Sequence, residues 1–232
     1  GTNGHVNNSH LNVGNSMAIT AHGKLLVSGW NGWDYKASQY TLEGALEANW
    51  TVQPAERAAS NRARGIIARE DGDILLLGNT NAVFCYQSVR LNFQGAFEYQ
   101  ASLPDVGSNH YAENILLLPD NKVLIVGQAN GDAYIGRWNA DGSPDTTFGT
   151  NGGVQIPVLS GSDFAFRPTL QPDGKIILVG ASHNGSNWDI NVIRMSYDGV
   201  LDTSFDSDGI AHIPFSGAND YGLATLVLPD GK

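Results

Sequence analysis

The sequence predicts an all-β protein, a β-propeller built from four-stranded antiparallel blades. A strand–turn–strand unit recurs along the 232 residues, and the glycines that close it lie about 50 residues apart: Gly29, Gly78, Gly127 and Gly180. Each repeat holds about four short strand-like runs, and this repeat length with this strand count is typical of a propeller blade. No apolar stripe of helical period extends over ten or more residues, so a helical solenoid is not predicted.

The clearest strand–turn–strand unit lies in the fourth repeat. Its first strand ends at Gln171, and the segment Pro172-Asp173-Gly174-Lys175 follows. Proline presets φ for a turn, aspartate can hydrogen-bond its own backbone, and glycine accepts a positive φ. The β-branched run Ile176–Gly180 then predicts the second strand, which ends at the closing glycine.

A second turn follows the third strand of each repeat, at Glu43-Gly44, Gln94-Gly95, Asp141-Gly142 and Asp198-Gly199. After it, the third and fourth repeats carry the similar segments Thr146-Thr147-Phe148-Gly149 and Thr203-Ser204-Phe205-Asp206. Each of these leads into a short run that predicts a fourth strand. The repeats therefore have the same internal order of strands and turns.

The predicted repeats cover residues of about 17–54, 63–105, 112–160 and 165–217, with a lone strand at 5–9 and a partial repeat at 221–232. We expect a single β-propeller domain or a fragment of one, because the sequence begins inside one repeat and ends after the first strand of another. A fragment of a longer propeller is the favoured alternative over an unusual ring closure. Open strand edges could then pair with the rest of a parent chain or with another chain.

The segments Gln171–Gly180 and Asp198–Phe205 closely resemble the bacterial delta-60 repeat, a β-propeller family of unknown function. Asp141–Gly149 is similar to it as well. The resemblance covers roughly the whole chain. It is strong in the third and fourth repeats and weaker in the first two, where Ala21-His22-Gly23 and Glu70-Asp71-Gly72 replace the Pro-Asp-Gly turn. That family implies a fold and no catalytic motif.

Composition excludes some classes of partner. The net charge of −10 gives no basic face for nucleic acid. No apolar run reaches the roughly 18 residues that a membrane-spanning helix needs, so we expect no membrane insertion. Cys85 is the only cysteine, and its place in a strand predicts a small core residue. We expect an extracellular or cell-surface location, with acidic composition as the supporting association.

The candidate ligand-binding face is the one that carries the loops between the second and third strands, because these loops vary while the other turns repeat, and function usually resides on loops held by a rigid scaffold. Tryptophan planes beside carboxylates and amides suit a sugar ring. In the alternative interpretation, the tryptophans pack between blades and the aspartates cap turns. The candidate residues are Trp30, Trp33, Asp34, Asp132, His183, Trp188 and Asp189.

Catalytic and metal sites have little support in the sequence. No nucleophile elbow, zinc-ligand spacing or phosphate-binding loop is present, so we predict no catalytic residues and no cofactor. Asp206-Ser207-Asp208-Gly209 has the D-x-D-G pattern of a calcium loop, but the matching segment of the third repeat has no carboxylate. Calcium is therefore only a weak alternative.

The sequence thus predicts a non-enzymatic binding or adhesion module of a larger secreted or surface bacterial protein, with a carbohydrate or protein ligand. A structural spacer is one alternative. A carbohydrate-active hydrolase or lyase with its site in the central channel is another, and it would need carboxylates or histidines that converge on the propeller axis.

Overall fold

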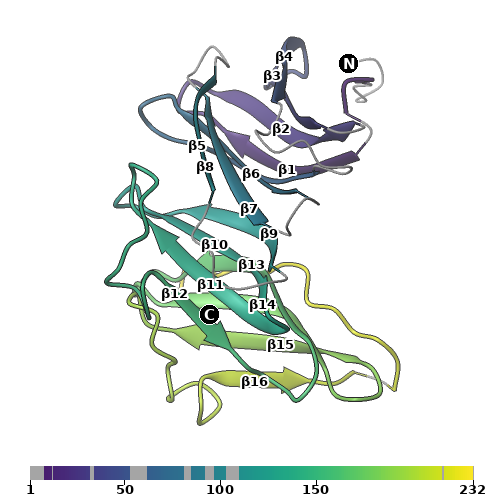
Figure 1. Ribbon diagram of the computed structural model, residues 1–232, viewed down its shortest axis with the longest axis vertical. Coiled ribbons are helices and arrows are strands. Elements are labelled where there is room, and N and C mark those ends of the chain that lie inside the picture. The colour runs from purple at the N-terminus through teal and green to yellow at the C-terminus, as the bar shows by residue number, and fades with distance from the viewer. Residues whose placement is uncertain are drawn as a thin grey trace. The chain divides into compact units, whose positions relative to one another are not determined.

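The computed structural model describes residues 8–11, 13–31, 34–52, 62–80, 85–91, 97–102, 110–215 and 217–231. These residues form strands and turns, and the strands assemble into four antiparallel sheets of four strands each (Figure 1). The predicted all-β class with four-stranded antiparallel blades is therefore confirmed. The chain divides into two compact units, residues 1–105 and 106–232.

Unit 1 contains two sheets whose strands are ordered as they follow along the chain. The first sheet comprises β1 (Val13–Ile19), β2 (Lys24–Asn31), β3 (Asp34–Thr41) and β4 (Leu46–Val52). The second comprises β5 (Arg62–Ala68), β6 (Ile74–Thr80), β7 (Cys85–Leu91) and β8 (Phe97–Ser102). The side chain of Cys85 lies outside the described part of the chain.

Unit 2 contains two sheets of the same kind, with short outer strands. The first comprises β9 (His110–Leu117), β10 (Val123–Ala129), β11 (Asp132–Trp138) and β12 (Gly153–Ile156). The second comprises β13 (Asp163–Leu170), β14 (Ile176–His183), β15 (Trp188–Met195) and β16 (Ile210–Ile213). Each sheet is one blade, and the three strands that follow its first strand pair in chain order.

The core of each unit lies between its two blades. In unit 1, β5 packs against β1, β2 and β3, and in unit 2, β13 packs against β9, β10 and β11. Every residue of β10 is buried, as expected for a strand covered on both faces. In unit 2 the core joins apolar side chains of both blades, among them Leu124, Ile135 and Phe148 from one and Ile176, Leu178 and Met195 from the other.

The closing glycines have a packing role. The first strand of each blade contains a β-bulge, which in the fourth blade lies between Ala165 and Arg167. The bulge brings the carbonyl oxygen of Phe164 to 1.8 Å from where a Cβ on Gly180 would lie. At Gly127 the carbonyl oxygen of Tyr111 would lie 1.7 Å from the added carbon. Only glycine fits opposite the bulge, which explains the spacing of these residues along the sequence.

The turn at Pro172-Asp173-Gly174-Lys175 forms as predicted. The backbone N–H of Gln171 donates to the carbonyl of Lys175 at 2.8 Å, and the N–H of Gly174 donates to the carbonyl of Gln171 at 3.0 Å. Gly174 has φ of +84°. The Asp173 carboxylate accepts a hydrogen bond from the N–H of Lys175 at 3.1 Å. The aspartate and the glycine therefore have the roles that their chemistry predicts.

The second turn of the third blade contains a buried ion-pair network. Arg137 is fully buried, and its Nε donates to Asp145 Oδ2 at 2.6 Å. Lys122 Nζ donates to the same oxygen at 2.8 Å. The guanidinium carbon of Arg137 lies 4.8 Å from the ring centres of both Phe148 and Tyr197. Tyr197 belongs to the next blade, so this arginine links the two blades of unit 2.

The fourth blade repeats this network in a more exposed form. Arg194 Nε donates to Asp202 Oδ2 at 2.8 Å, and Lys175 Nζ lies 3.0 Å from that oxygen. The guanidinium carbon of Arg194 lies 4.8 Å from the ring centre of Phe205. The similar Thr-Thr-Phe and Thr-Ser-Phe segments therefore serve to hold an arginine and to shape a turn.

The residues beyond β16 run alongside the last blade. Thr169 Oγ1 and Thr225 Oγ1 lie 2.6 Å apart, and Gln171 Nε2 donates to the carbonyl of Gly231 at 2.7 Å. Residues 221–231, which the sequence assigns to a partial repeat, form no strand there. Most of the predicted lone strand at 5–9 lies outside the described residues.

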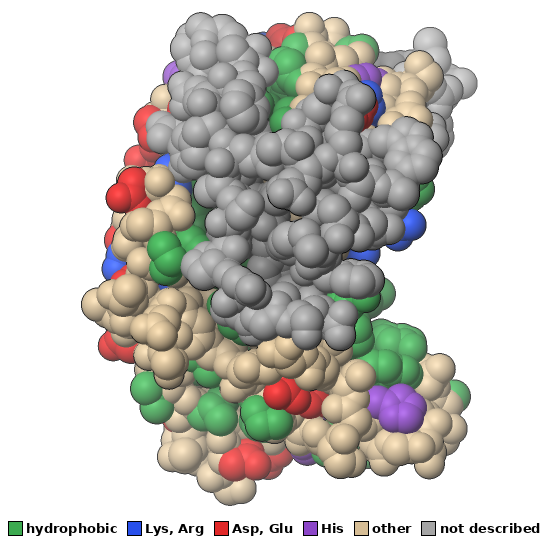
Figure 2. Space-filling model, in the orientation of Figure 1, with side chains coloured by type: hydrophobic (Ala, Val, Ile, Leu, Met, Phe, Trp, Pro, Cys, Tyr) green, Lys and Arg blue, Asp and Glu red, His purple; other side chains and the backbone are tan. Residues whose placement is uncertain are grey.

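On the face drawn in Figure 2, acidic side chains are scattered among polar and apolar ones. In the described part of the chain no helix is long and apolar enough to cross a membrane.

Candidate functional site

The loop between β14 and β15, residues 184–187, has a geometry that its own residues fix. Asn184 Oδ1 accepts hydrogen bonds from the backbone N–H groups of Ser186 at 2.9 Å and Asn187 at 3.0 Å. Gly185 has φ of +101°, which glycine adopts without strain. The loop closes on the pair formed by His183 and Trp188, the last residues of the β14–β15 ladder. This local order places both predicted side chains at one end of the blade.

The carboxylate of Asp189 holds the loop together. It is buried, with 8% of its surface exposed. Its Oδ2 accepts a hydrogen bond from Asn184 Nδ2 at 2.7 Å, and its Oδ1 accepts one from Asn187 Nδ2 at 3.2 Å. The carboxylate therefore orients the two asparagines. These asparagines and the exposed loop backbone form a polar rim at this end of the blade.

An aromatic cluster surrounds Trp188. The ring of His183 meets it edge-on with a centroid distance of 5.2 Å, and Tyr221 stacks on it at 6.1 Å with an interplanar angle of 29°. Phe164 lies 5.6 Å from Trp188 and stacks with Phe166 at 5.5 Å. Tyr221 is 45% exposed, whereas the other four rings are partly buried. The cluster thus has an accessible aromatic edge backed by further rings.

The segment after β16 completes this end of the blade. The backbone N–H of Trp188 donates to Asn219 Oδ1 at 3.1 Å, and the N–H of Asp220 donates to the carbonyl of Trp188 at 2.7 Å. Asn187 Nδ2 donates to the carbonyl of Ala218. These contacts fix the position of Tyr221 beside the tryptophan, so aromatic rings and amide groups share one surface.

The structure brings three of the seven predicted residues together: His183, Trp188 and Asp189. Trp30 and Asp34 lie in unit 1, on β2 and β3. The guanidinium carbon of Arg62, on the neighbouring blade, lies 4.9 Å from the centre of the Trp30 ring. Asp34 Oδ2 lies 3.8 Å from Lys36 Nζ. Trp33 lies outside the described residues.

Asp132 follows the tight turn between β10 and β11, where Asn130 and Gly131 both have positive φ, as a type I′ hairpin requires. Its Oδ2 accepts a hydrogen bond from Gln155 Nε2 at 3.4 Å. This turn presents no aromatic side chain comparable to Trp188. The third blade therefore lacks the arrangement found in the fourth.

Asp163 lies next to Phe164 and is fully buried. Its Oδ2 accepts a hydrogen bond from the N–H of Val158 at 2.8 Å, and its carboxylate also accepts from the N–H of Leu159 at 3.3 Å. Burial raises the pKa of Asp163 above its usual value, and the charge of Asp132 raises that pKa further. Asp163 therefore shapes the entry to β13 and is not available to a ligand.

Sequence reasoning did not select Phe164, Phe166, Asn219 and Tyr221. A usable signal was present in the repeat itself: Asp163-Phe164 and Asp220-Tyr221 stand at the same distance before the two Pro-Asp-Gly-Lys segments. Phe164 lies near the start of β13, at the loop end of the fourth blade, whereas Tyr221 belongs to no strand. The stacking with Trp188, however, depends on the folding of the segment after β16.

The Asp206–Gly209 segment forms a turn in which Asp206 and Ser207 have φ of 44° and 68°. Asp208 Oδ1 accepts a hydrogen bond from the N–H of Ile210 at 2.9 Å. Among the residues that the structure describes, no three His, Cys, Asp or Glu side chains gather as a metal ion would require.

Comparison with known proteins supports the propeller fold. A family model described as a domain of unknown function (DUF5122) beta-propeller matches residues 118–148 and 171–205. These two segments contain the two middle strands of the third and fourth blades, β10 and β11 and β14 and β15, with the turns on either side. No curated protein sequence matches the chain.

Solved structures are similar in fold at low sequence identity. A protein of unknown function from Dyadobacter fermentans is 8% identical with a TM-score of 0.57, over 81% of this chain and 66% of that one. A Lactobacillus plantarum protein is 10% identical with a TM-score of 0.51, over 86% and 54%. A catalytically inactive virginiamycin B lyase from Staphylococcus aureus, solved with quinupristin, is 16% identical with a TM-score of 0.51, over 88% and 71%. The chain thus spans about half to two thirds of the length of the Lactobacillus plantarum and Dyadobacter fermentans proteins.

Proposed function

We propose that the chain is part of a non-enzymatic binding module that recognises carbohydrate through the loop end of its fourth blade. The observation that carries this proposal is the stacking of Tyr221 on Trp188 beside the exposed polar residues 184–186 and 219. A pyranose ring has an apolar face that packs on an aromatic plane, and its hydroxyl groups take hydrogen bonds from amides. Aromatic planes with a polar rim provide both kinds of contact.

In this proposal the residues have distinct roles. Tyr221 and Trp188 contact the sugar ring, with His183 at the edge of Trp188. The exposed backbone of the loop binds hydroxyl groups. Both polar atoms of the Asn184 side chain are already engaged within the loop, so Asn184 is a positioning residue. Asp189 is a positioning residue, because its two oxygens are already engaged by Asn184 and Asn187.

A non-enzymatic role and a secreted or cell-surface setting belong to the same proposal. The sequence carries no recognised catalytic motif, and its acidic composition is common among extracellular bacterial proteins. The likeness to the virginiamycin B lyase supports the fold alone, since the identity is 16%.

The test is a glycan-array screen of the purified protein, with and without calcium, followed by titration of any glycan that binds. Trp188→Ala should abolish binding, whereas Phe215→Ala, which removes a 74% exposed aromatic ring and keeps the backbone hydrogen bond of residue 215 to Asp220, should leave it unchanged. Far-UV circular dichroism must show that both variants fold.

Two results would contradict the proposal. A blank array with folded wild-type protein would exclude a carbohydrate ligand of the kinds tested and favour a spacer or a protein-binding role. Binding that survives in Trp188→Ala would place the site elsewhere. Binding that requires calcium would direct attention to the turn at Asp206–Gly209.

A further inference from the structure

The segment of residues 220–231 lies against the fourth blade in the way that β13 lies against the third. The backbone N–H of Asp163, at the start of β13, donates to the carbonyl of Gly131 in the preceding blade at 2.7 Å. The N–H of Asp220 donates to the carbonyl of Trp188 at 2.7 Å. Each acceptor stands the same number of residues before its aspartate, so the two contacts are equivalent in the repeat.

The carboxylates of these two aspartates also have equivalent partners. Asp163 Oδ2 accepts a hydrogen bond from the N–H of Val158 at 2.8 Å, and Asp220 Oδ2 accepts one from the N–H of Phe215 at 3.2 Å. In both cases the donor stands 5 residues before the aspartate. The bend that leads into the first strand of a blade is therefore formed at residues 215–220 as well.

After this bend the segment runs alongside β13. Arg167 Nε donates to the carbonyl of Leu223 at 3.4 Å, and Thr169 Oγ1 lies 2.6 Å from Thr225 Oγ1. Both contacts join residues that are 56 positions apart, so the two segments run side by side in the same direction. Residues 221–228 therefore have the place of a first strand of a further blade.

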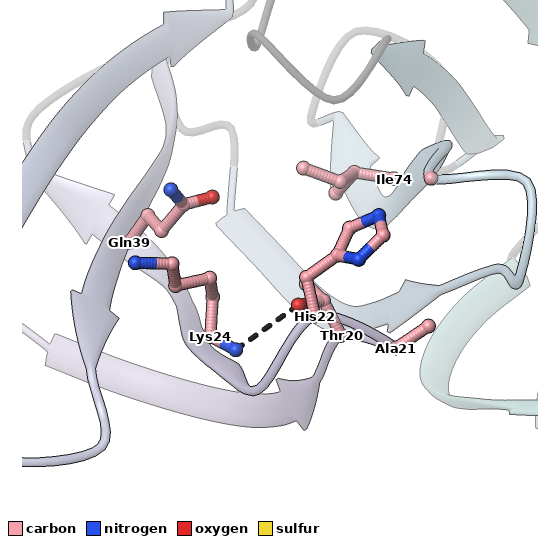
Figure 3. Close-up of a pocket in the computed structure, with 7 residues that line it drawn as sticks. Thr20, Ala21, His22, Lys24, Gln39 and Ile74 are labelled. Carbon is pink, nitrogen blue, oxygen red and sulfur yellow. Dashed lines mark hydrogen bonds between the residues drawn. The ribbon is translucent and has the colours of Figure 1, made fainter.

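The turn after this segment meets the first turn of the fourth blade. The carbonyl of Gly231, in that turn, accepts a hydrogen bond from Gln171 Nε2 at 2.7 Å. The turns of two neighbouring blades also meet in unit 1, where residues 20–22 of the first blade and Gly72 of the second line a common cavity of about 150 Å³ beside Gln39 (Figure 3). The turn at Gly231 thus follows the same arrangement of blade against blade.

The segment differs from β13 because it has no partner strand. β13 pairs with β14 along its whole length. Residues 221–228 belong to none of the sheets that the described part of the chain forms. Leu223, Leu226 and Leu228 are exposed, Leu226 to 83%. An unpaired edge with exposed apolar side chains is a template for the addition of a strand.

A strand that fits this edge has a glycine at a fixed position. In the fourth blade Gly180 pairs with Ala165, and a Cβ on Gly180 would lie 1.8 Å from the carbonyl oxygen of Phe164. Counted from the aspartate that starts each segment, Tyr221 and Gly222 have the positions of Phe164 and Ala165. A strand paired in the same register therefore places its glycine opposite Gly222.

Apolar residues precede that glycine in the partner strand. In β14 the run Ile176–Val179 stands there, and its Ile177 pairs with Thr169, whose counterpart in the segment is Leu226. The strands β2, β6, β10 and β14 share this pattern of an apolar run before a glycine. Each of them lies between two strands of its own sheet, so none is available to a second copy of the chain.

We propose that residues 221–228 bind an extended strand of another polypeptide, with the sequence pattern of the second strands of these blades. The strand adds in the antiparallel direction, with its glycine opposite Gly222 and an apolar residue opposite Leu226. Main-chain hydrogen bonds hold such a strand, and the close approach at the glycine gives specificity. The proposal rests on the backbone of the segment and is independent of the proposed carbohydrate site.

The test is a titration of the protein with a synthetic peptide that has the sequence of residues 175–183, followed by ¹H–¹⁵N chemical shifts of the protein. The amide signals of residues 222–227 should shift. The same peptide with Gly180→Ala should bind at least about tenfold more weakly, because its added methyl group meets the carbonyl of Tyr221. Equal binding of the two peptides, or no binding of the first, would overturn the proposal.

A pair of variants tests the location. Leu226→Asp places a charge opposite the apolar residues of the peptide and should weaken binding at least about threefold. Leu42→Asp changes another exposed leucine, in a turn of the first blade, and should bind the peptide as the wild type does. Binding that Leu226→Asp leaves unchanged would overturn the proposal. Shifts of the signals of residues 222–227 on raising the protein concentration alone would assign the edge to a second copy and would overturn it as well.

Discussion

The guanidinium Nε of Arg137 donates a 2.6 Å hydrogen bond to Asp145 Oδ2, and the side chains of both residues are almost completely buried. Each partner removes the cost of burying the other's charge. The carbonyl of Tyr197, on the next blade, accepts a hydrogen bond from Arg137 Nη1. The pair therefore stabilises a blade and the contact between two blades at the same time.

Replacement of Asp145 by asparagine should destabilise the protein strongly. Breaking a buried ion pair from one side costs about 3–5 kcal/mol, because it leaves an uncompensated buried charge. Asp202→Asn is the matched control, and it should cost clearly less because the Asp202 and Arg194 side chains are 14% and 20% exposed. Urea unfolding of both variants measures the difference. Equal losses would mean that burial does not set the strength of this pair.

Acid should destabilise the protein through these same carboxylates. Burial alone would raise the pKa of Asp145, but hydrogen bonds from Lys122, Thr147 and Arg137 outweigh it and hold that pKa well below its usual value. A hydrogen bond from Ser204, followed by one from Lys175, lowers the pKa of Asp202. A carboxylate with a lowered folded-state pKa contributes stability above its unfolded pKa, and this contribution is lost as the pH falls.

We therefore expect the free energy of unfolding to fall as the pH drops below about 4. Urea unfolding at a series of pH values measures it. Asp145→Asn should show a shallower fall than the wild type, because the titrating carboxylate is gone. A slope identical in variant and wild type would contradict the assigned role.

Gly180→Ala should disrupt the fourth blade. Its Cβ would lie 1.8 Å from the carbonyl oxygen of Phe164, and backbone atoms cannot move aside as a flexible side chain can. We expect a loss of about 1–3 kcal/mol or more, as for other forced overpacking. Gly217→Ala, where no atom lies within 4 Å of the added carbon, should change stability by less than about 0.5 kcal/mol. Thermal unfolding measures both.

Tyr221 separates ring stacking from hydrogen bonding in the proposed carbohydrate site. Tyr221→Phe keeps the ring that stacks on Trp188, whereas Tyr221→Ala removes it. If stacking dominates, alanine should weaken glycan binding by about 1 kcal/mol, and phenylalanine should keep most of the affinity. Titration of the two variants against the same glycan measures this. Equal losses would show that the hydroxyl group, and not the ring, makes the contact.

Much of the fold was predictable because the strands, turns and glycines repeat. The Pro-Asp-Gly turn at residues 172–174 has a local cause, since its residues set their own backbone angles. The candidate site was only partly predictable. His183, Trp188 and Asp189 lie at a hairpin end that local sequence defines, but Tyr221 reaches Trp188 only through contacts made by residues 218–220. Such contacts join segments about 30 residues apart, and no sequence pattern encodes them.

The sequence by itself determined the all-β class, the four-stranded blades, the turn chemistry and the place of the closing glycines, because each follows from a few neighbouring residues. Only the tertiary structure decided that Arg137 lies between two aromatic rings, that Asp189 orients a loop, and that a cavity remains beside Gln39. These depend on side chains from strands and blades that are distant along the chain. Their meeting is set by strand register and by packing between blades, and neither can be read from a single repeat.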